Sequence, residues 1–231
     1  MPFDIIFCGD SIVELEKLKD KVIDIVITDP PYGVNYTSNW SQDLTRPSKQ
    51  SILNDTLEDA CNLLDKVCDI LSRKTKDDAH IYIFTRWDIY PIFKSIVDKY
   101  FTVKSLLVWD TCSHGMGDLT QSWGCQTEFI IFAVKGNKKL VHRSPNLLTH
   151  NKVTAKGNIH STQKPVKLIR DLIDASAVDG DVICDPFMGS GSTIKAVIER
   201  GNLHYIGYEL NKNIFQKAEI FINKSKTSRL W

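Results

Sequence analysis

The sequence predicts an α/β fold in which a mostly parallel, seven-stranded sheet lies between two layers of helices. Seven runs are rich in Ile, Val and Phe and almost entirely apolar, as is typical of strands buried on both faces of a sheet. Amphipathic patterns with apolar residues at three- and four-residue steps separate several of these runs. With 231 residues, the chain is long enough for one such domain, and we expect residues 1–231 to form it.

The expected elements can be placed along the chain in order. The strands are Asp4–Cys8, Ile23–Thr28, His80–Thr85, Ser105–Trp109, Phe129–Val134, Val182–Cys184 and Tyr205–Tyr208. The helical patterns are Thr56–Arg73, Pro165–Ser176, with its proline in the first turn, and Asn211–Asn223, and a further helix starts at Ser192 or Thr193. Residues 37–54 and 111–126 match neither pattern and are expected to be long loops, which often carry function.

The composition is ordinary for a soluble globular protein, with 42% hydrophobic and 25% charged residues. No run approaches the ~20 apolar residues of a membrane span, and the N-terminus lacks the features of a signal peptide, so we predict a cytoplasmic protein without membrane contact. The six cysteines form no CxxC pair and are expected to be free thiols. A zinc site at Cys112, His114 and Cys125 is the alternative, but we predict no metal site.

Basic residues are concentrated in one part of the chain. The net charge is only +1, yet the 42 residues between Glu128 and Asp171 carry nine Lys or Arg and no Asp or Glu. Such segregation predicts a face that binds a polyanion such as nucleic acid, although a solvated charged loop would look the same. We expect phosphate contacts from four cations of this segment. They are Lys138, Lys139, Arg143 and Lys152.

A glycine-rich turn near the C-terminus predicts a nucleotide-like ligand. In "DVICDPFMGSGSTIKAVIERGNLHYIGYEL" a strand is followed by Gly189-Ser190-Gly191, a helix and a second strand ending at Glu209. Glycines let the backbone approach a ligand, and a carboxylate after the second strand can bind ribose hydroxyls. The motif is neither a Walker A loop nor a full GxGxxG. Because Asp185 and Phe187 precede the turn, a ligand with positive charge, such as a sulfonium, fits better than a pyrophosphate.

Asp29-Pro30-Pro31-Tyr32 follows an apolar strand and is expected at the same edge of the sheet as the glycine turn. Two prolines make a stiff loop whose carbonyls remain free acceptors. A carboxylate and a carbonyl together suit an exocyclic NH₂ group, and Tyr32 can stack on a planar base. Two strong acceptors would free the amino lone pair for attack on an electrophile. A plain proline turn without chemistry is the alternative.

These segments resemble the amino-methylating DNA methyltransferases that use S-adenosylmethionine. Asp29–Tyr32 and Phe187–Gly191 carry the resemblance, together with His160-Ser161-Thr162-Gln163-Lys164-Pro165, which is similar to an (H)xTQKP motif. Their order resembles the β class, a circular permutation of the usual layout. The resemblance covers roughly residues 3 to 222 and implies a three-layer, circularly permuted Rossmann-like methyltransferase fold.

The resemblance also implies roles for individual residues. Asp29, Pro30, Pro31 and Tyr32 would hold a flipped base and form the catalytic loop. The cofactor residues would be Asp10, Asp29, Thr162, Lys164, Asp185, Phe187, Gly189, Ser190, Gly191 and Glu209. Trp109 and Glu128 match family positions in the central strands, where we expect structural roles. The chain departs from the family in having Asp110 after the tryptophan and Ser161 before TQKP.

The expected activity is methyl transfer from S-adenosylmethionine to adenine N6 in double-stranded DNA, by base flipping and direct transfer. Aspartate at position 29 resembles adenine enzymes, and cytosine N4 is the first alternative. An RNA- or protein-amide methyltransferase and an inactive DNA-binding module are the others. Residues 37–54 and 111–126 would face DNA, and residues 136–159 would form a short, basic target-recognition insertion. A homodimer and a cognate restriction endonuclease are the expected protein partners.

Overall fold

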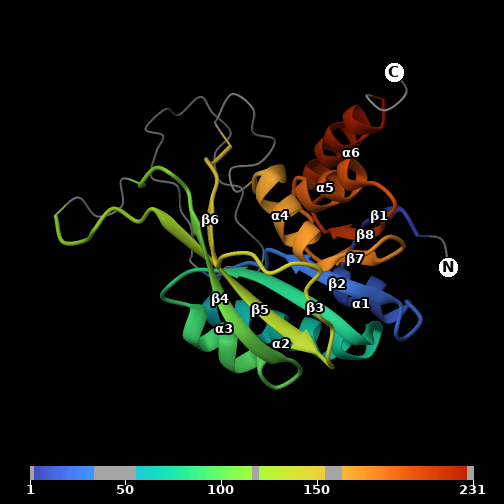
Figure 1. Ribbon diagram of the computed structural model, residues 1–231, viewed down its shortest axis with the longest axis horizontal. Helices are drawn as coiled ribbons and strands as arrows, with labels where there is room; N and C mark the ends of the chain where they lie inside the picture. Colours follow the sequence, from blue (N-terminus) through green and yellow to red (C-terminus); the bar gives the residue numbers. More distant parts are fainter. Residues whose placement is uncertain (1–2, 34–55, 116–119, 154–162, 228–231) are drawn as a thin grey trace.

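The computed structural model describes residues 3–33, 56–115, 120–153 and 163–227, with side chains to residue 223. It confirms the predicted α/β fold, in which helices cover both faces of a mostly parallel sheet (Figure 1). The elements, in chain order, are β1 (Ile5–Cys8), α1 (Ser11–Glu16), β2 (Ile23–Thr28), α2 (Leu57–Lys74), β3 (Thr75–Thr85), α3 (Tyr90–Val97), β4 (Thr102–Asp110), β5 (Thr127–Lys135), β6 (Leu147–Thr149), α4 (Val166–Ser176), β7 (Val182–Asp185), α5 (Ser192–Arg200), β8 (His204–Glu209) and α6 (Lys212–Thr227).

Within the described residues the sheet has eight strands in the order β1-β8-β7-β2-β3-β5-β4-β6. The seven expected strands are all present, and β6 is the additional one. It lies inside the basic segment and pairs in parallel with β4, with Leu148 opposite Trp109. β5 is antiparallel to both of its neighbours, β3 and β4. The short helices α1 and α3 were not among the predicted elements.

Two hydrophobic cores, one on each face of the sheet, produce the three layers. All six residues of β2 are buried, and its side chains alternate between the two faces. Val26 packs with residues of α1, α2 and α3, whereas Ile25 and Ile27 pack with residues of α4, α5 and α6. Figure 1 shows these two groups of helices on opposite sides of the strands. Burial on both faces explains why β2 reads as a continuous apolar run.

The parallel strands β1, β2, β3, β7 and β8 end at one edge of the sheet, called here the carboxyl edge. β2 pairs directly with β7, so Asp29 and Asp185 end neighbouring strands. Because β5 runs in the opposite direction, its first residues, including Glu128, also lie at this edge. None of the helices in the described residues is long and apolar enough to cross a membrane.

Candidate active site

The glycine turn after β7 has the backbone shape that the sequence predicts. Gly189 and Gly191 have φ values of 50° and 82°, in the left-handed region where a side chain is strained. A Cβ on Gly191 would lie 2.8 Å from Cδ1 of Ile222 in α6, so a side chain there would also displace the end of that isoleucine. At Gly189 a Cβ would meet only Phe187 O, at 4.0 Å. The turn therefore packs against α6 at Gly191, and the space beside Gly189 is open.

Glu209, at the end of β8, is tied directly to this turn. Its Oε2 accepts a hydrogen bond from Gly189 N–H at 3.1 Å, and its Oε1 accepts one from Asn211 N–H at 2.7 Å. Burial raises the pKa of the Glu209 carboxyl, and the bonds from the Asn211 and Gly189 amides oppose that rise. The carboxylate is thus held beside the glycine turn, with lone pairs left for further donors.

Asp185 is a buried carboxyl beneath the same turn. Its exposed fraction is 4%, and Oδ1 accepts a hydrogen bond from Phe187 N–H at 3.1 Å. Burial raises the pKa of Asp185 to about 7, because the charged form loses its hydration. Asp185 is therefore held directly before the glycine turn by its bond to Phe187.

Replacing Asp185 by asparagine is expected to change how stability depends on pH. Because the pKa of Asp185 in the folded protein, about 7, exceeds the usual 3.8, the native state binds the extra proton between these values. Ionisation then opposes folding, and stability falls as pH rises through this window, by an amount on the order of a few kcal/mol. Asp185→Asn mimics the protonated form. Urea unfolding at pH 5 and pH 8 should show a smaller loss for Asp185→Asn than for the wild type, and equal losses would contradict the assignment.

Asp29 and Tyr32 form a compact unit directly after β2. The Tyr32 hydroxyl donates a hydrogen bond to Oδ1 of Asp29, and the Tyr32 ring packs edge-on against Phe93 at 6.4 Å between centroids. Gly33 has a φ of 65°, and a Cβ there would lie 2.4 Å from backbone atoms of Leu57. Burial and the charges of Asp29 and Glu128 raise the pKa of the Tyr32 phenol well above its usual range, so the phenol remains a donor.

A chain of ion pairs connects Asp29 to the start of β5. Lys164 Nζ lies 2.6 Å from Asp29 Oδ2 and 3.3 Å from Glu128 Oε2, and Lys152 Nζ lies 3.2 Å from Glu128 Oε1. Burial alone would lower the pKa of Lys164, but the carboxylates of Asp29 and Glu128 outweigh it and raise that pKa. For Glu128, burial acts to raise the pKa, and the two lysines lower it overall. Glu128 and Lys164 are therefore both charged at neutral pH.

Asp10 and Ser190 also lie at the carboxyl edge, as predicted. Asp10 caps α1 by accepting a hydrogen bond from Ile12 N–H at 2.9 Å, and the neighbouring Gly9 N–H donates to Glu209 O at 3.0 Å. Ser190 is buried, with its hydroxyl 3.3 Å from that of Ser192. Asp10, Asp29, Asp185, the glycine turn and Glu209 are thus brought to one edge by strands far apart in the sequence.

Other expected site residues are only partly covered by the described residues. Thr162 and residues 37–54 lie outside the described residues. Residues 116–119 of the segment 111–126 and residues 154–159 of the segment 136–159 also lie outside them. Residues 111–115 follow β4 and residues 120–126 lead into β5. Together they form a segment, called here the arm, that projects from the body of the protein (Figure 1). Trp123 on this arm is 99% exposed. The arm starts from the carboxyl edge, where β4 ends opposite the first residue of β5.

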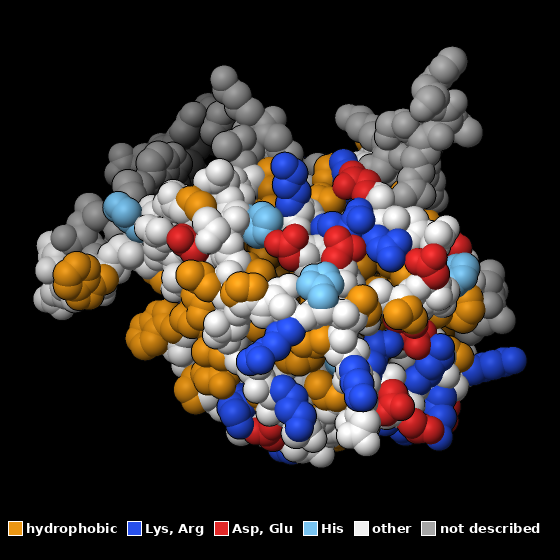
Figure 2. All heavy atoms as spheres, in the orientation of Figure 1, with side chains coloured by type: hydrophobic (Ala, Val, Ile, Leu, Met, Phe, Trp, Pro, Cys, Tyr) orange, Lys and Arg blue, Asp and Glu red, His pale blue; other side chains and the backbone are white. Residues whose placement is uncertain are grey.

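The four predicted DNA-contacting cations do not lie on one face. Lys138 Nζ is 3.1 Å from Asp181 Oδ2, immediately before β7, which places Lys138 at the edge opposite Asp29. Lys139 is exposed beside it. Lys152 alone of the four joins the ion pairs at the carboxyl edge. Figure 2 shows Lys and Arg side chains spread over the visible face with acidic residues between them. The expectation of a single basic docking face is therefore corrected.

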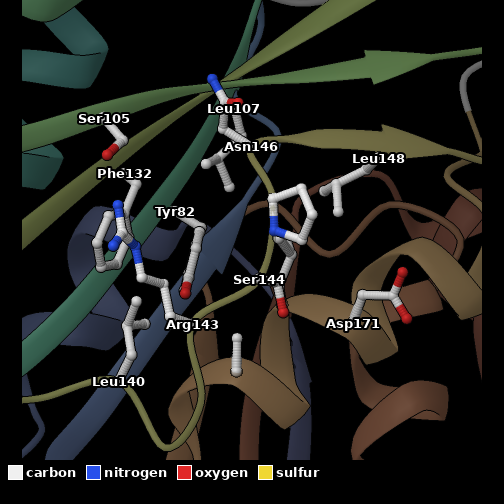
Figure 3. Close-up of a pocket in the computed structure, with 13 residues that line it drawn as sticks. Tyr82, Ser105, Leu107, Phe132, Leu140, Arg143, Ser144, Asn146, Leu148 and Asp171 are labelled. Carbon is white, nitrogen blue, oxygen red and sulfur yellow. The ribbon is translucent and has the colours of Figure 1, made fainter.

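Arg143 lies at a separate cavity of about 520 Å³. Figure 3 shows it sharing the cavity wall with Tyr82 and Phe132 of the sheet, while Asp171 of α4 lies on another side. At its base, the Tyr82 hydroxyl is 2.5 Å from Ser176 Oγ, which is also 2.9 Å from His80 Nδ1. None of the residues that line this cavity belongs to the ion-pair chain or the glycine turn.

Two family-matched positions have different roles in the structure. Trp109 is buried, and its indole N–H donates to His150 O at 2.7 Å, which is structural as expected. Glu128 was also expected to be structural, but it lies at the centre of the ion pairs. The feature of the sequence that could have indicated this role is a carboxylate at the start of an apolar strand. Among the described residues, no group of three His, Cys, Asp or Glu side chains is arranged to bind a metal ion.

Comparisons with known proteins identify the family. Residues 23–220 match the DNA methylase family N6_N4_Mtase. The DNA adenine methyltransferase YhdJ of Escherichia coli K12 is 25% identical over 88% of this chain and 77% of its own. The type II methyltransferase M.HpaI of Haemophilus parainfluenzae is 28% identical over 93% of this chain and 72% of its own.

Two solved structures share the fold. The M1.HpyAVI–SAM complex superimposes with a TM-score of 0.70 at 22% identity, covering 94% of this chain and 98% of that one. The cytosine-N4-specific PvuII DNA methyltransferase gives a TM-score of 0.71 at 16% identity, covering 97% and 93%. At these identities the likeness concerns the fold alone. Since the family match spans most of the sequence and both halves of the site, the chain belongs to the N6_N4_Mtase family of DNA methylases.

Proposed function

We propose that this protein methylates the N6 amino group of adenine in duplex DNA, with S-adenosylmethionine as the methyl donor. The observation that carries the proposal is the placement of Asp29 and Tyr32 on the strand next to the one that leads into the glycine turn. An amino-group acceptor and a nucleoside-binding turn therefore lie side by side. The motif order, which resembles the β class, and aspartate at position 29 support adenine, as does the name of the YhdJ relative.

The residues at the turn fit this cofactor. The open space at Gly189 lets the backbone approach a nucleoside, and Glu209 has free lone pairs for ribose hydroxyls. When bound, S-adenosylmethionine supplies an electrophilic methyl carbon, so that an N–C bond forms as the C–S bond breaks. Phe187, Ser190 and Asp10 complete the proposed adenosine side, and Thr162 and Lys164 the methionine side. Asp185 supports the turn from below.

Asp29, with the Pro30 carbonyl, would accept the hydrogens of the flipped amino group, while Tyr32 stacks on the base. Acceptors on both hydrogens leave the nitrogen lone pair free to attack. Asp29 would also take the proton that the methylated nitrogen sheds. Alignment supplies most of the rate enhancement, and no covalent enzyme intermediate is required. Extrusion of the base costs a few kcal/mol, which contacts in the pocket offset.

The remaining partners and segments are proposed on the resemblance. Residues 37–54 and 111–126 would face DNA, and of residues 136–159 the part around Lys152 would recognise the target within a single catalytic domain. The exposed Trp123 favours the arm as one contact. A homodimer and a cognate restriction endonuclease remain proposed partners.

The test is incubation of purified protein with methyl-labelled S-adenosylmethionine and mixed-sequence duplex DNA, followed by digestion to nucleosides. Labelled N6-methyladenine is the expected product. Labelled N4-methylcytosine would correct the base, an outcome that the fold shared with PvuII keeps open. Label in RNA or protein but not in DNA would contradict the proposed substrate.

Lys152 is expected to contact DNA phosphate, whereas Lys139 is not, because only Lys152 lies at the carboxyl edge. Lys152→Gln should reduce the slope of log affinity against log salt by about 0.9, the value for one phosphate contact. Lys139→Gln, an equally exposed change at the opposite edge, is the matched control and should leave the slope unaltered. Fluorescence anisotropy across a salt series measures both. Equal slopes in the two variants would place the DNA elsewhere.

A further inference from the structure

Each oxygen of the Asp29 carboxylate already accepts one hydrogen bond in this structure. The Tyr32 hydroxyl donates to Oδ1, and Lys164 Nζ lies 2.6 Å from Oδ2. In the proposed reaction, Asp29 must accept a hydrogen from the neutral amino group of the target base. A hydrogen bond from an ammonium is roughly twice as strong as one from a neutral donor. Oδ2 keeps a second lone pair, but the ammonium of Lys164 offsets much of its negative charge, so Oδ2 is a weak acceptor for the amino hydrogen until the ammonium moves away.

Lys164 has one other carboxylate partner among the described residues, and it is Glu128. The Lys164 side chain is only 10% exposed, so its ammonium cannot move into water without losing the packing of its stem. The ammonium lies 5.2 Å from the centre of the Phe84 ring, which offers no carboxylate. Glu128 Oε2 is already 3.3 Å from Nζ, longer than a good charged hydrogen bond and free to shorten.

The backbone of Lys164 is anchored, so its movement is confined to the ammonium end. Ser192 Oγ donates to Lys164 O at 2.8 Å, which ties the lysine to the first residue of α5. The following Pro165 is the N-cap of α4. With both sides of the lysine fixed, a small rotation of the side chain exchanges a short contact with Asp29 for a short contact with Glu128.

We propose that Glu128 is a positioning residue that draws the ammonium of Lys164 away from Asp29 when the target amino group enters. This inference rests on the proposed function, since it assigns a step to the same site. Glu128 touches neither the base nor the cofactor in this scheme and acts through Lys164. The exchange strengthens Asp29 Oδ2 as an acceptor for the amino hydrogen and keeps the buried ammonium paired throughout.

The isosteric change Glu128→Gln tests this step, because it removes the charge and keeps the shape. Lys164 then stays on Asp29, and the single-turnover rate constant at saturating DNA and cofactor should fall about 10-fold or more. The dissociation constant for S-adenosylmethionine should stay within about 2-fold, because the cofactor does not contact Glu128, and saturating DNA removes any change in DNA affinity that follows from freeing Lys152. Glu128→Asp retains a carboxylate and should stay within about 3-fold of the wild-type rate constant.

A double-mutant cycle with Lys164→Met separates positioning from structural support. If Glu128 acts through Lys164, Glu128→Gln should cost less than about 2-fold in the Lys164→Met background. An undiminished effect there would overturn the proposal, as would a wild-type rate constant in Glu128→Gln or a loss in Glu128→Asp as large as in Glu128→Gln. A fall in both binding affinity and melting temperature in Glu128→Gln would mean a structural role. Absence of methyl transfer by the wild type would instead overturn the proposed function, and the inference with it.

Discussion

Asp29→Ala is expected to lower the rate constant for methyl transfer by about 10³-fold or more, on the scale of removing a preorganised catalytic group. The truncated side chain offers no acceptor to the amino group, so the nitrogen lone pair remains delocalised in the ring. Lys164 keeps its pairing with Glu128, so the ammonium is not left without a partner. Affinity for S-adenosylmethionine should remain within a few fold, because the glycine turn and Glu209 form their contacts without Asp29.

Single-turnover methyl transfer and isothermal titration of the cofactor measure these two quantities separately. Asp29→Asn is the matched control, because it keeps the side-chain shape and one acceptor oxygen but removes the charge. It should retain more activity than Asp29→Ala. A parallel loss of cofactor affinity in Asp29→Ala would remove Asp29 from the catalytic role and place it in the cofactor site.

Glu209→Ala is expected to raise the cofactor dissociation constant by about 100-fold, since a hydrogen bond to a charged group contributes roughly 1.5–3 kcal/mol. Two effects combine in this variant. The ribose hydroxyls lose their acceptor, and Gly189 N–H loses the partner that holds the turn at 3.1 Å. The rate constant at saturating cofactor should change much less than the affinity, because Glu209 is remote from the amino group.

Glu209→Gln separates these two effects. One amide oxygen can still accept the hydrogen bond from Gly189 N–H, but the charge that binds the ribose is gone. The cofactor dissociation constant of Glu209→Gln should lie between those of the wild type and Glu209→Ala. Calorimetric titration with S-adenosylmethionine gives all three values. An unaltered constant in Glu209→Ala would rule out the ribose assignment, whatever the effect on the turn.

The sequence was sufficient to predict the parts of the site that are carried by parallel strands. β2 and β7 read as apolar runs, and the general rule that ligands bind at the carboxyl ends of strands placed Asp29 near the glycine turn. Glycine at 189 and 191 predicted the turn through backbone sterics, which depend on local sequence alone. The sequence predicted a shared edge, and the pairing of β2 with β7 makes the two segments neighbours.

The parts that sequence reasoning missed depend on strand direction and on long-range pairing. Glu128 begins an apolar strand, and only the antiparallel orientation of β5 brings that beginning to the edge where β2 ends. Lys138 counts as a free cation in the sequence, yet Asp181, 43 residues further along, pairs with it. The three residues of β6 are too few for a periodic pattern and pair only because β4 offers an edge.

The pairing of β1 with β8 has a consequence for how the protein is made. Ile5 lies opposite Ile206, and Asp4 N–H bonds to Tyr205 O, so the first strand finds its place in the sheet through residues near the end of the chain. During synthesis, β1 cannot pair until β8 has been translated. Contacts between residues so far apart in the sequence form slowly, because the entropy of closing a large loop is lost before the contacts contribute any stability. The edge that holds Asp10 and Glu209 is therefore completed only after β8 has been synthesised and has paired with β1.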